Sequence, residues 1–549
     1  NIFLTPQLRP FYGGTFFPKN DSYGKIGFLR LVKNMAEVWE SRREEISDFS
    51  NQVFSILEQD SEQREYLEKE YSNELFKKYF DVCRREADMK NGGFGKGAKF
   101  PNWSCLSYLL KYAKRYEQES ALEVVSVALD KILSRGLFDH LEPSFFRYCT
   151  DAEWNIPHFE KMLYDQAQGI KVLVEAYHVF KKSIYLKKAE EIAGFVIDNL
   201  KDPQGGFWAS MDADFKGEEG AFYTWEESEI EKVFWKKMVL RKDSSLGSKG
   251  VLQLSNDLDF LQKEELSFLL EKRSKRGRVQ IDKSRLVAWN ALLASAFCKL
   301  SLHSSLSWLH EEAKGILNVI KEFSKEDKIP HLLSKESNKE YFEDYAYFIQ
   351  ALIDYYEATF DVEFLNSAYQ WNFKLQEKFG NKLEEMKRLS KKSSEGFVAS
   401  LDLYDIDVPS SLSCCAKNFW RLSSYFGNRD LKENVCKWVK TQIEEVERYP
   451  QGYSSFLEVA DLVHFPFLEL SVIADTSLKR ESIGKKLRKK TLFENAYAVY
   501  SPQTLDQMPD NSLFSKPLTK GKSQEIYLCT QGTCLGSFDE EDEITFLGS

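Results

Sequence analysis

The stretch LYDQAQGIKVLVEAYHVFKKSIYL, residues 163–186, contains the pattern that decides the fold. Its apolar residues recur every three or four positions, which predicts a helix with one buried face: the series is Leu163, Ala167, Ile170, Val174 and Tyr177. A short polar turn follows Phe180, and a second helical segment starts directly after it. The stretch therefore predicts a helical hairpin.

The same hairpin pattern recurs along the chain. Junctions of similar sequence begin at Tyr116, Phe180, Phe360 and Phe426, with a looser one near Leu302, which indicates one hairpin per about 60 residues. The sequence GFWASMD at 206–212 returns as GFVASLD at 396–402, which supports a repeat. A sixth hairpin would pair a helix near 454–472 with one near 72–89. We therefore predict a mainly α fold, an (α/α)6 toroid; an open solenoid is the structural alternative.

Three segments are expected. Residues 1–60 hold two short strands, Ile2–Leu4 and Phe16-Phe17, with a turn at Pro10–Gly14, and a two-stranded sheet is not stable alone. Because the chain begins with Asn rather than Met, we expect a fragment or processed product in which this segment is the end of a domain. Residues 70–475 form the toroid, with an insertion at 203–285, and residues 476–549 form a small α/β tail.

Composition restricts the partners. The 549 residues include 75 Lys and Arg against 85 Asp and Glu, a net charge of −10, which argues against nucleic acid. No apolar run reaches 18 residues, so no membrane-spanning helix is expected. Nine thinly spread cysteines indicate a reducing compartment, and we predict a cytoplasmic protein that binds a small molecule and needs no cofactor. The oligomeric state is not predicted.

The densest polar stretch lies between residues 139 and 165. We expect His158, Glu160 and Asp165 to supply a general acid/base and its orienting carboxylate. Nearby polar and aromatic residues are candidates for binding a substrate: His140, Arg147, Tyr148 and Trp154. In the alternative interpretation, His158 caps a helix and Glu160 is surface charge.

A second cluster follows at residues 212–225. Asp212 and Asp214 are candidates for acid/base work, and Glu219, Tyr223 and Trp225 for substrate binding, because carboxylates beside aromatic rings suit sugars. Solvated turn residues are the alternative. The spacing also faintly resembles a calcium loop but lacks the full pattern, so no metal is predicted.

Two further pairs fall where inner helices of the toroid should begin. Trp289-Asn290 and Glu343-Asp344 are candidate pocket residues, although acidic residues at a helix start are often only caps and dipole partners.

Several motifs together resemble the spermatogenesis-associated protein 20-like family, which includes bacterial YyaL-type proteins. They are PFYGGTFFP at 10–18, GGFG at 92–95, KFP at 99–101, PHFEKMLYD at 157–165, DAD at 212–214 and Trp289-Asn290. The resemblance runs from residue 1 to about 535.

The resemblance implies a thioredoxin-like domain followed by a six-hairpin (α/α)6 domain similar to N-acylglucosamine 2-epimerases and six-hairpin glycosidases. Residues 1–18 would then be the last strands of a thioredoxin-like domain whose Cys-x-x-Cys segment is missing. Since a fold does not assign a reaction, three functions stay open. The first is a carbohydrate-active epimerase, isomerase or glycoside hydrolase, and the second is a non-catalytic module that binds a glycan or a protein beside a redox domain. A thiol–disulfide protein without its redox half is a third.

Overall fold

A computed structural model of the chain describes all residues except 16, 22–25, 63–66, 257, 259–262, 326, 338, 390–402, 502–512, 531 and 545–549. The second copy of the repeated heptapeptide, at 396–402, lies outside the described residues. Internal contacts divide the chain into two units, Asn1–Glu68 with Phe379–Asp402, and Lys69–Lys378 with Leu403–Ser549.

The first unit starts with a β-hairpin and two helices. β1 (Ile2–Leu4) pairs antiparallel with β2 (Pro10–Gly13), and α1 (Phe28–Ser41), α2 (Arg43–Glu62) and α13 (Leu383–Leu389) are its helices. The predicted turn at Pro10–Gly14 is wrong, because the chain reverses at Thr5–Arg9. There the amide of Leu8 donates to the carbonyl of Thr5 (2.8 Å), and Leu8 has φ = 61°.

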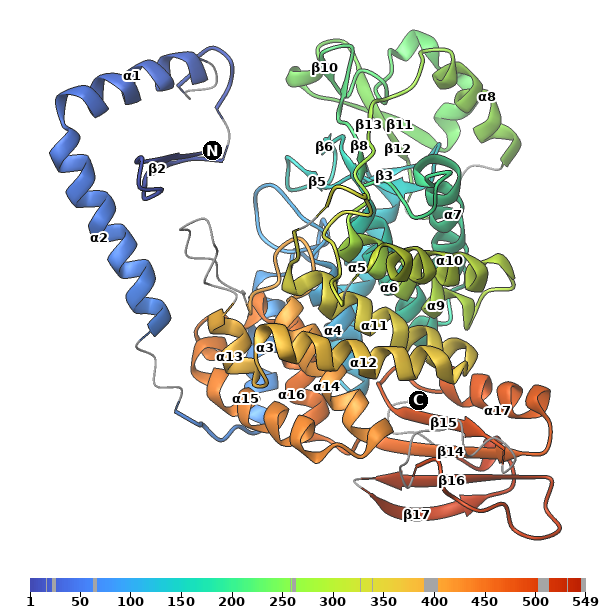
Figure 1. Ribbon diagram of the computed structural model, residues 1–549. Helices are drawn as coiled ribbons and strands as arrows, with labels where there is room; N and C mark the ends of the chain where they lie inside the picture. The colour runs from blue at the N-terminus through green and yellow to red at the C-terminus, as the bar shows by residue number, and fades with distance from the viewer. Residues whose placement is uncertain are drawn as a thin grey trace. The chain divides into compact units, whose positions relative to one another are not determined.

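The second unit is built on twelve helices that alternate between an inner and an outer ring (Figure 1). The inner helices are α4 (Trp103–Arg115), α6 (Leu163–Phe180), α9 (Val287–Ser301), α11 (Phe342–Thr359), α14 (Ser411–Phe426) and α16 (Ser454–His464). The outer helices are α5 (Glu119–Ser134), α7 (Ser183–Leu200), α10 (Trp308–Phe323), α12 (Val362–Phe379), α15 (Arg429–Arg448) and α3 (Asn73–Glu86).

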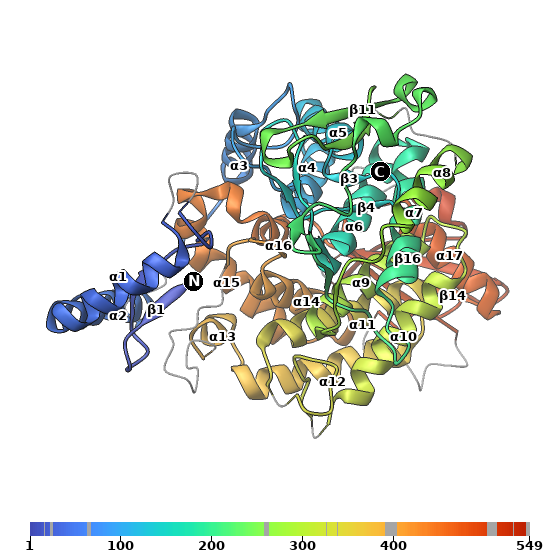
Figure 2. The same ribbon diagram turned by 90° about the horizontal axis from the view of Figure 1, so that it is seen from above.

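The inner helices form a closed ring. Each packs against the next in chain order, and α16 packs against α4, so that the six surround one axis (Figure 2). The last hairpin joins the two ends of the ring, where Tyr79 on α3 and Ser454 on α16 share a hydrogen bond of 2.9 Å between their hydroxyls. The predicted (α/α)6 toroid is thus confirmed, and the open solenoid is excluded.

The short junctions recognised in the sequence are tight helix–helix turns. Each of four contains one residue in the left-handed conformation, which ends the inner helix and reverses the chain: Glu117 (φ 51°), Lys181 (56°), Phe360 (62°) and Gly427 (65°).

The insertion and short strands lie at the end of the ring where the inner helices begin (Figure 1). The strands are β3 (Phe138–Asp139), β4 (Ser144–Phe145), β5 (Tyr148–Cys149), β6 (Pro157–His158), β7 (Lys161–Met162), β8 (Ser210–Met211), β9 (Asp214–Phe215), β10 (Glu218–Glu219), β11 (Met238–Lys242), β12 (Gly250–Leu254) and β13 (Ile281–Asp282). The insertion also carries α8 (Lys263–Ser274) and the 3-10 turns Glu227–Glu229, Lys232–Lys236 and Ser244–Leu246.

Buried charges tie α8 to the ring. Asp139 accepts from Lys161 Nζ (2.6 Å) and Arg273 Nη1 (2.9 Å), and Arg273 Nη2 also donates to Glu142 (2.6 Å). We call these four residues the insertion cluster. Burial alone would raise the pKa of Asp139, but Arg273 and Lys161 outweigh it and hold that pKa below its usual range.

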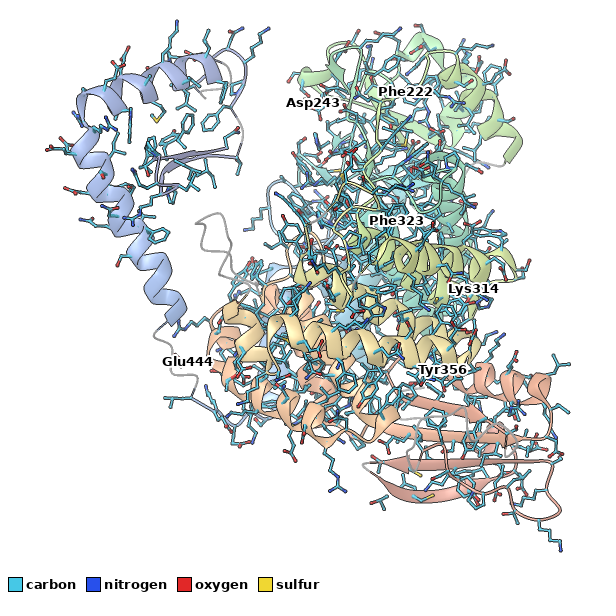
Figure 3. All side chains as sticks on the ribbon, viewed as in Figure 1. Phe222, Asp243, Lys314, Phe323, Tyr356 and Glu444 are labelled. Atoms are coloured by element: carbon cyan, nitrogen blue, oxygen red, sulfur yellow. The ribbon has the colours of Figure 1, made fainter. Side chains whose placement is uncertain are left out.

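The C-terminal segment is a mixed sheet with one helix. Its strand order is β15 (Ala496–Tyr500), β14 (Leu468–Ala474), β16 (Gln524–Thr530), β17 (Thr533–Phe538), with α17 (Ser477–Lys489) and a 3-10 turn at Glu541–Glu543. Tyr356 of α11 lies where this sheet meets the ring and donates to the carbonyl of Tyr497 (2.7 Å; Figure 3).

The helix predicted near 454–472 is shorter than expected. α16 ends at His464, a 3-10 turn (Pro450–Gly452) precedes it, and Leu468–Ala474 form the strand β14 in the C-terminal sheet. The predicted domain limits stay predictions. None of the helices in the described part of the chain is long and apolar enough to span a membrane.

Candidate functional site

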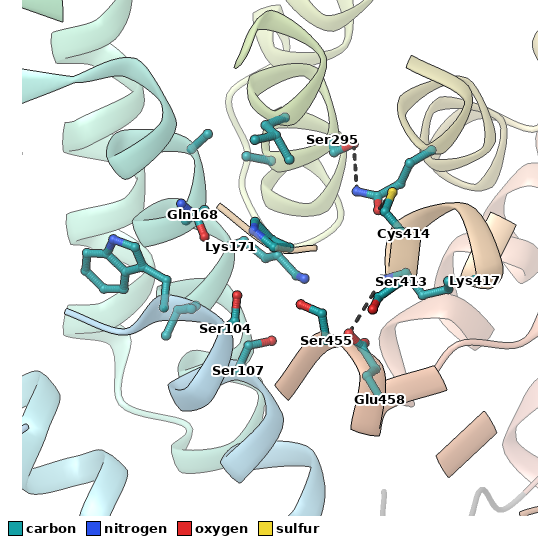
Figure 4. A pocket seen from close by; sticks show the side chains of 17 residues that line it. Ser104, Ser107, Gln168, Lys171, Ser295, Ser413, Cys414, Lys417, Ser455 and Glu458 are labelled. Carbon is teal, nitrogen blue, oxygen red and sulfur yellow. Dashed lines mark hydrogen bonds and ion pairs between the residues drawn. The ribbon is translucent and has the colours of Figure 1, made fainter. Parts of the chain in front are cut away.

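The axis of the ring contains a chain of three adjoining pockets. The central one, about 670 Å³, is lined from all six inner helices, by residues that include Ser104, Lys171, Ser295, Gln350, Ser413 and Ser455 (Figure 4). A mouth pocket of about 480 Å³ shares Trp103, Ser104 and Gln168 with it. A floor pocket of about 460 Å³ shares Lys171, Ser295, Gln350 and Lys417 with it and ends at α17.

Asp165 is a buried acid in the mouth pocket. It sits in the first turn of α6, and its Oδ1 accepts from the indole Nε1 of Trp103 (3.1 Å). Its Oδ2 is buried and has no hydrogen-bond partner among the described residues. Burial raises the pKa of Asp165 well above its ordinary value and outweighs the opposing hydrogen bond from Trp103. Burial therefore favours the protonated, neutral form of this side chain.

Aromatic rings surround this acid. Trp103 and Tyr164 line the mouth pocket, and Trp289 packs edge-on against Tyr164 with ring centroids 4.9 Å apart. The Tyr164 hydroxyl is buried without a partner among the described side chains, and burial raises the pKa of that phenol. Such rings offer stacking faces to a sugar, and the phenol and acid offer hydrogen bonds.

His158 lies in a cluster of carboxylates beside the mouth. Its Nδ1 bonds Glu219 Oε1 (2.6 Å), and its Nε2 lies 3.7 Å from Glu160 Oε2. The hydrogen bond to Glu219 raises the pKa of His158 and lowers that of Glu219. Arg147 joins this cluster to the mouth pocket, because it donates to Glu160 (3.2 Å) and to Asp407 (3.1 Å).

The strand pair β5–β6 positions these groups. Tyr148 lies opposite His158 in the register, their ring centroids are 5.2 Å apart, and Phe100 stacks on Tyr148 at 4.6 Å. The predicted carboxylates of the insertion lie in two different environments. Glu219 turns to His158, whereas Asp212 and Asp214 are exposed in a turn where Asp212 Oδ1 accepts from the amide of Asp214 (3.0 Å).

Five other predicted residues are buried in packing and do not line the axial pockets. They are His140, which bonds the carbonyl of Arg135; Trp154, which donates to the carbonyl of Gly92; Tyr223, between Phe146 and Phe159; Trp225, in the apolar core of the insertion; and Asn290, which accepts from the amide of Phe207. Burial also lowers the pKa of His140 to about 4. Their proposed contacts with substrate stay predictions.

Glu343 and Asp344 begin α11, beside a histidine that the sequence analysis did not single out. Asp344 accepts from the amide of Ala288 and from His331 Nδ1, both at 3.0 Å, and burial raises its pKa to about 7. One ligand atom from each of His331, Glu343 and Asp344 lies within 4.8 Å of the others, so these residues could approach a metal ion. The hydrogen bonds already made by Asp344 also suit a helix start.

Among the polar groups on the axis, Asp165 was predicted from the sequence, whereas Gln168 and Lys171 were not. On α6, Asp165, Gln168 and Lys171 are spaced by three residues, a spacing that keeps them on neighbouring parts of one helix face. Polar residues at three-residue intervals in an otherwise apolar helix were the sequence signal that could have indicated residues facing the axis.

Two comparisons by sequence find relatives of the chain. Residues 1–58 match the Thioredox_DsbH family, described as "Protein of unknown function, DUF255". Spermatogenesis-associated protein 20 of Mus musculus is 24% identical over 576 residues, which cover 91% of this chain and 71% of the relative. The Homo sapiens protein of that name is 25% identical over 578 residues, covering 91% and 72%.

Solved structures similar to this chain include sugar-processing proteins. The sugar epimerase from a ruminal bacterium has a TM-score of 0.45 at 11% identity and covers 72% of this chain and 87% of its own. A cellobiose 2-epimerase from Spirochaeta thermophila has 0.47 at 13%, covering 68% and 83%. A family 76 glycoside hydrolase from Bacteroides thetaiotaomicron has 0.45 at 10%, covering 71% and 77%. The sequence relatives confirm the predicted resemblance of this chain to the spermatogenesis-associated protein 20-like family.

Proposed function

We propose that the toroid binds a carbohydrate at its mouth and acts on it by acid/base chemistry, as an epimerase, an isomerase or a glycoside hydrolase. The observation that carries the proposal is Asp165, a buried carboxyl with a raised pKa, whose Oδ2 has no partner among the described residues and which lines a pocket with Trp103 and Tyr164. A carboxyl whose pKa is raised by burial holds its proton more firmly than a solvated one and can donate it to a sugar oxygen.

The charged residues beside the mouth pocket are candidates for the base. The His158–Glu219 pair and Glu160 form a charged cluster next to the mouth, and Arg147 connects that cluster to the pocket wall. The environments of Asp165 and Glu219 move their pKa values apart, one up and one down, which is the arrangement expected of an acid and a group that stays ionised. In this proposal Asp165 is the acid, and His158 with its partner Glu219 and the neighbouring Glu160 is the candidate base.

The test is a panel of mono- and disaccharides given to the full chain and to the Asp165→Asn variant. Asn keeps the acceptor for Trp103 but carries no acidic proton. We expect turnover by the wild type to fall by about 100-fold or more in Asp165→Asn, in line with general acid catalysis. Asp430→Asn, at an exposed position on the outer helix α15, is the matched control and should keep full turnover.

Binding of a sugar without any turnover would replace the enzyme by a non-catalytic glycan-binding module. Neither binding nor turnover across the panel would remove the carbohydrate proposal itself.

A further inference from the structure

We propose that the substrate is a sugar carrying an anionic group, a carboxylate or a phosphate, and that this group binds Lys171 in the central axial pocket. This proposal rests on the carbohydrate function proposed above and adds the charge and orientation of the ligand.

In the central and floor pockets, every charged side chain except Lys171 has an ion-pair partner within the described part of the chain. Five cations pair with five carboxylates: Lys111, Lys299, Lys417, Arg421 and Arg488 with Glu175, Asp354, Glu357, Glu458 and Glu494. Lys171 lines both the central and the floor pocket and makes no hydrogen bond or ion pair with any described residue. It is the surplus cation of these two pockets.

The carboxylates nearest to Lys171 are already engaged. Glu175 receives Lys299 (2.5 Å) and lies 3.8 Å from Lys111, and it also accepts from Ser107 (2.6 Å). Glu458 pairs with Lys111 and with Lys417 (3.5 Å). Lys171 influences both carboxylates only through longer-range attraction, which helps to lower their pKa values, that of Glu175 to about 2. An anion from solution is the partner that Lys171 lacks.

Hydroxyl groups face the amine of Lys171. Figure 4 shows this side chain extending into the pocket toward Ser104, Ser107 and Ser455. Ser413 also lines the pocket, and its hydroxyl is buried without a partner among the described residues. Ser107 already donates to Glu175, so the hydroxyls of the other three serines are the candidate donors. A lysine beside such donors suits the oxygens of a phosphate or carboxylate. A neutral sugar hydroxyl would leave the charge of the half-buried Lys171 without an opposite charge.

The helix α6 sets the distance between the two ends of the ligand. Asp165 and Lys171 are six residues apart, and at a rise of about 1.5 Å per residue they are separated by about 9 Å along the helix axis. Gln168 lies between them and lines both pockets. A hexose with a terminal anionic group matches this span, with its ring at Asp165 and its charge at Lys171.

The experiment measures binding to the full chain by titration calorimetry. The probes are glucose, glucuronate, glucose 6-phosphate and inorganic phosphate, given to the wild type, Lys171→Met, Lys171→Arg and the control Lys187→Met, whose side chain is 68% exposed. We expect at least one of the two anionic sugars to bind the wild type more than about 10-fold tighter than glucose, as one well-placed charge-assisted contact provides. The better of the two shows whether the group is a carboxylate or a phosphate.

In Lys171→Met this preference should fall to less than about threefold, whereas Lys171→Arg and Lys187→Met should keep most of it. Lys171→Met removes an unpaired charge, so its melting temperature without ligand should equal or exceed that of the wild type. If Lys171→Met does not fold, Lys171→Gln takes its place.

Equal affinity of the wild type for glucose and both anionic sugars, or an undiminished preference in folded Lys171→Met, would overturn this inference and leave the carbohydrate function standing. Binding of inorganic phosphate that depends on Lys171, with no sugar bound, would instead support the anion site and refute the carbohydrate function.

Discussion

The insertion cluster and the axial pocket both place charged groups inside the protein, but they satisfy them differently. In the insertion cluster, each charge of Asp139, Lys161 and Arg273 meets an opposite charge within 2.9 Å. In the axial pocket and its mouth, Lys171 and one oxygen of Asp165 have no partner among the described residues. Complete pairing serves the stability of the protein, whereas unpaired groups in an accessible pocket are available to a ligand.

The largest expected effect comes from breaking the insertion cluster. Asp139→Asn removes the anion shared by Lys161 and Arg273 and leaves two buried cations without it, so the free energy of unfolding should fall by about 3–5 kcal/mol. Urea denaturation followed by circular dichroism measures this change. Asp198→Asn, at an exposed position on α7, should change it by less than about 0.5 kcal/mol. If the free energy of unfolding of Asp139→Asn also fell by less than about 0.5 kcal/mol, the insertion cluster would not be needed for stability.

The second effect is a pH dependence of stability at Asp165, which distinguishes the mouth pocket from the insertion cluster. The pKa of Asp165 is higher in the folded chain than in the unfolded chain. The stability that protonated Asp165 contributes is therefore fully present below about pH 4, the unfolded value, and is lost as the pH rises toward the folded value. Asp165→Asn has no such proton. The stability of this variant relative to the wild type should therefore increase with pH, by at most about 1.4 kcal/mol per pH unit.

The measurement for Asp165 is a set of urea denaturation curves between pH 4 and 8. Asp430→Asn gives the control, and its difference from the wild type should stay flat. A flat difference for Asp165→Asn as well would mean that Asp165 is ionised in the folded protein, which contradicts its role as the acid.

The smallest effect concerns the charged cluster beside the mouth. Glu219→Gln removes the anion that raises the pKa of His158, so the histidine should titrate at a lower pH, closer to its ordinary value of about 6.5. Because this pair is partly exposed, the free energy of unfolding should change by less than about 1 kcal/mol. An NMR titration of the histidine ring protons reports the shift.

Glu218→Gln is the control for that titration, since Glu218 pairs with Lys249 instead. An equal shift in both variants would assign the effect to overall charge and not to the hydrogen bond with Glu219.

Much of the ring could be predicted from the sequence because local signals repeat. Apolar spacing marked the inner helices, and the junctions at Tyr116, Phe180, Phe360 and Phe426 became turns with a left-handed residue. The error at Leu468–Ala474 has a physical reason. A short apolar run is compatible with a helix or a buried strand, and its pairing with β15 and β16 depends on segments further along the chain.

The candidate site could be predicted only in part. His158 and Glu160 stood out because they are close in sequence, and Glu219 because it lies in an acidic stretch. That Glu219 reaches His158 across 61 positions, while Asp212 and Asp214 remain exposed, follows from the pairing of β9 with β10 and the folding of the insertion. The sequence also offered Trp154 and Trp225 as ligands of a sugar, but the tertiary structure buries both in packing.

The sequence by itself determined the helical hairpins and their number, because helix periodicity and turn chemistry act between near neighbours. Only the tertiary structure decided which polar residues are solvated and which face the axis. An inner helix has one face toward its outer partner and another toward the axis, and a lysine on the axial face looks in sequence like any surface lysine. Closing the ring gives Lys111, Lys299 and Lys417 their carboxylates and leaves Lys171 without one, because pairing requires side chains from different helices to meet.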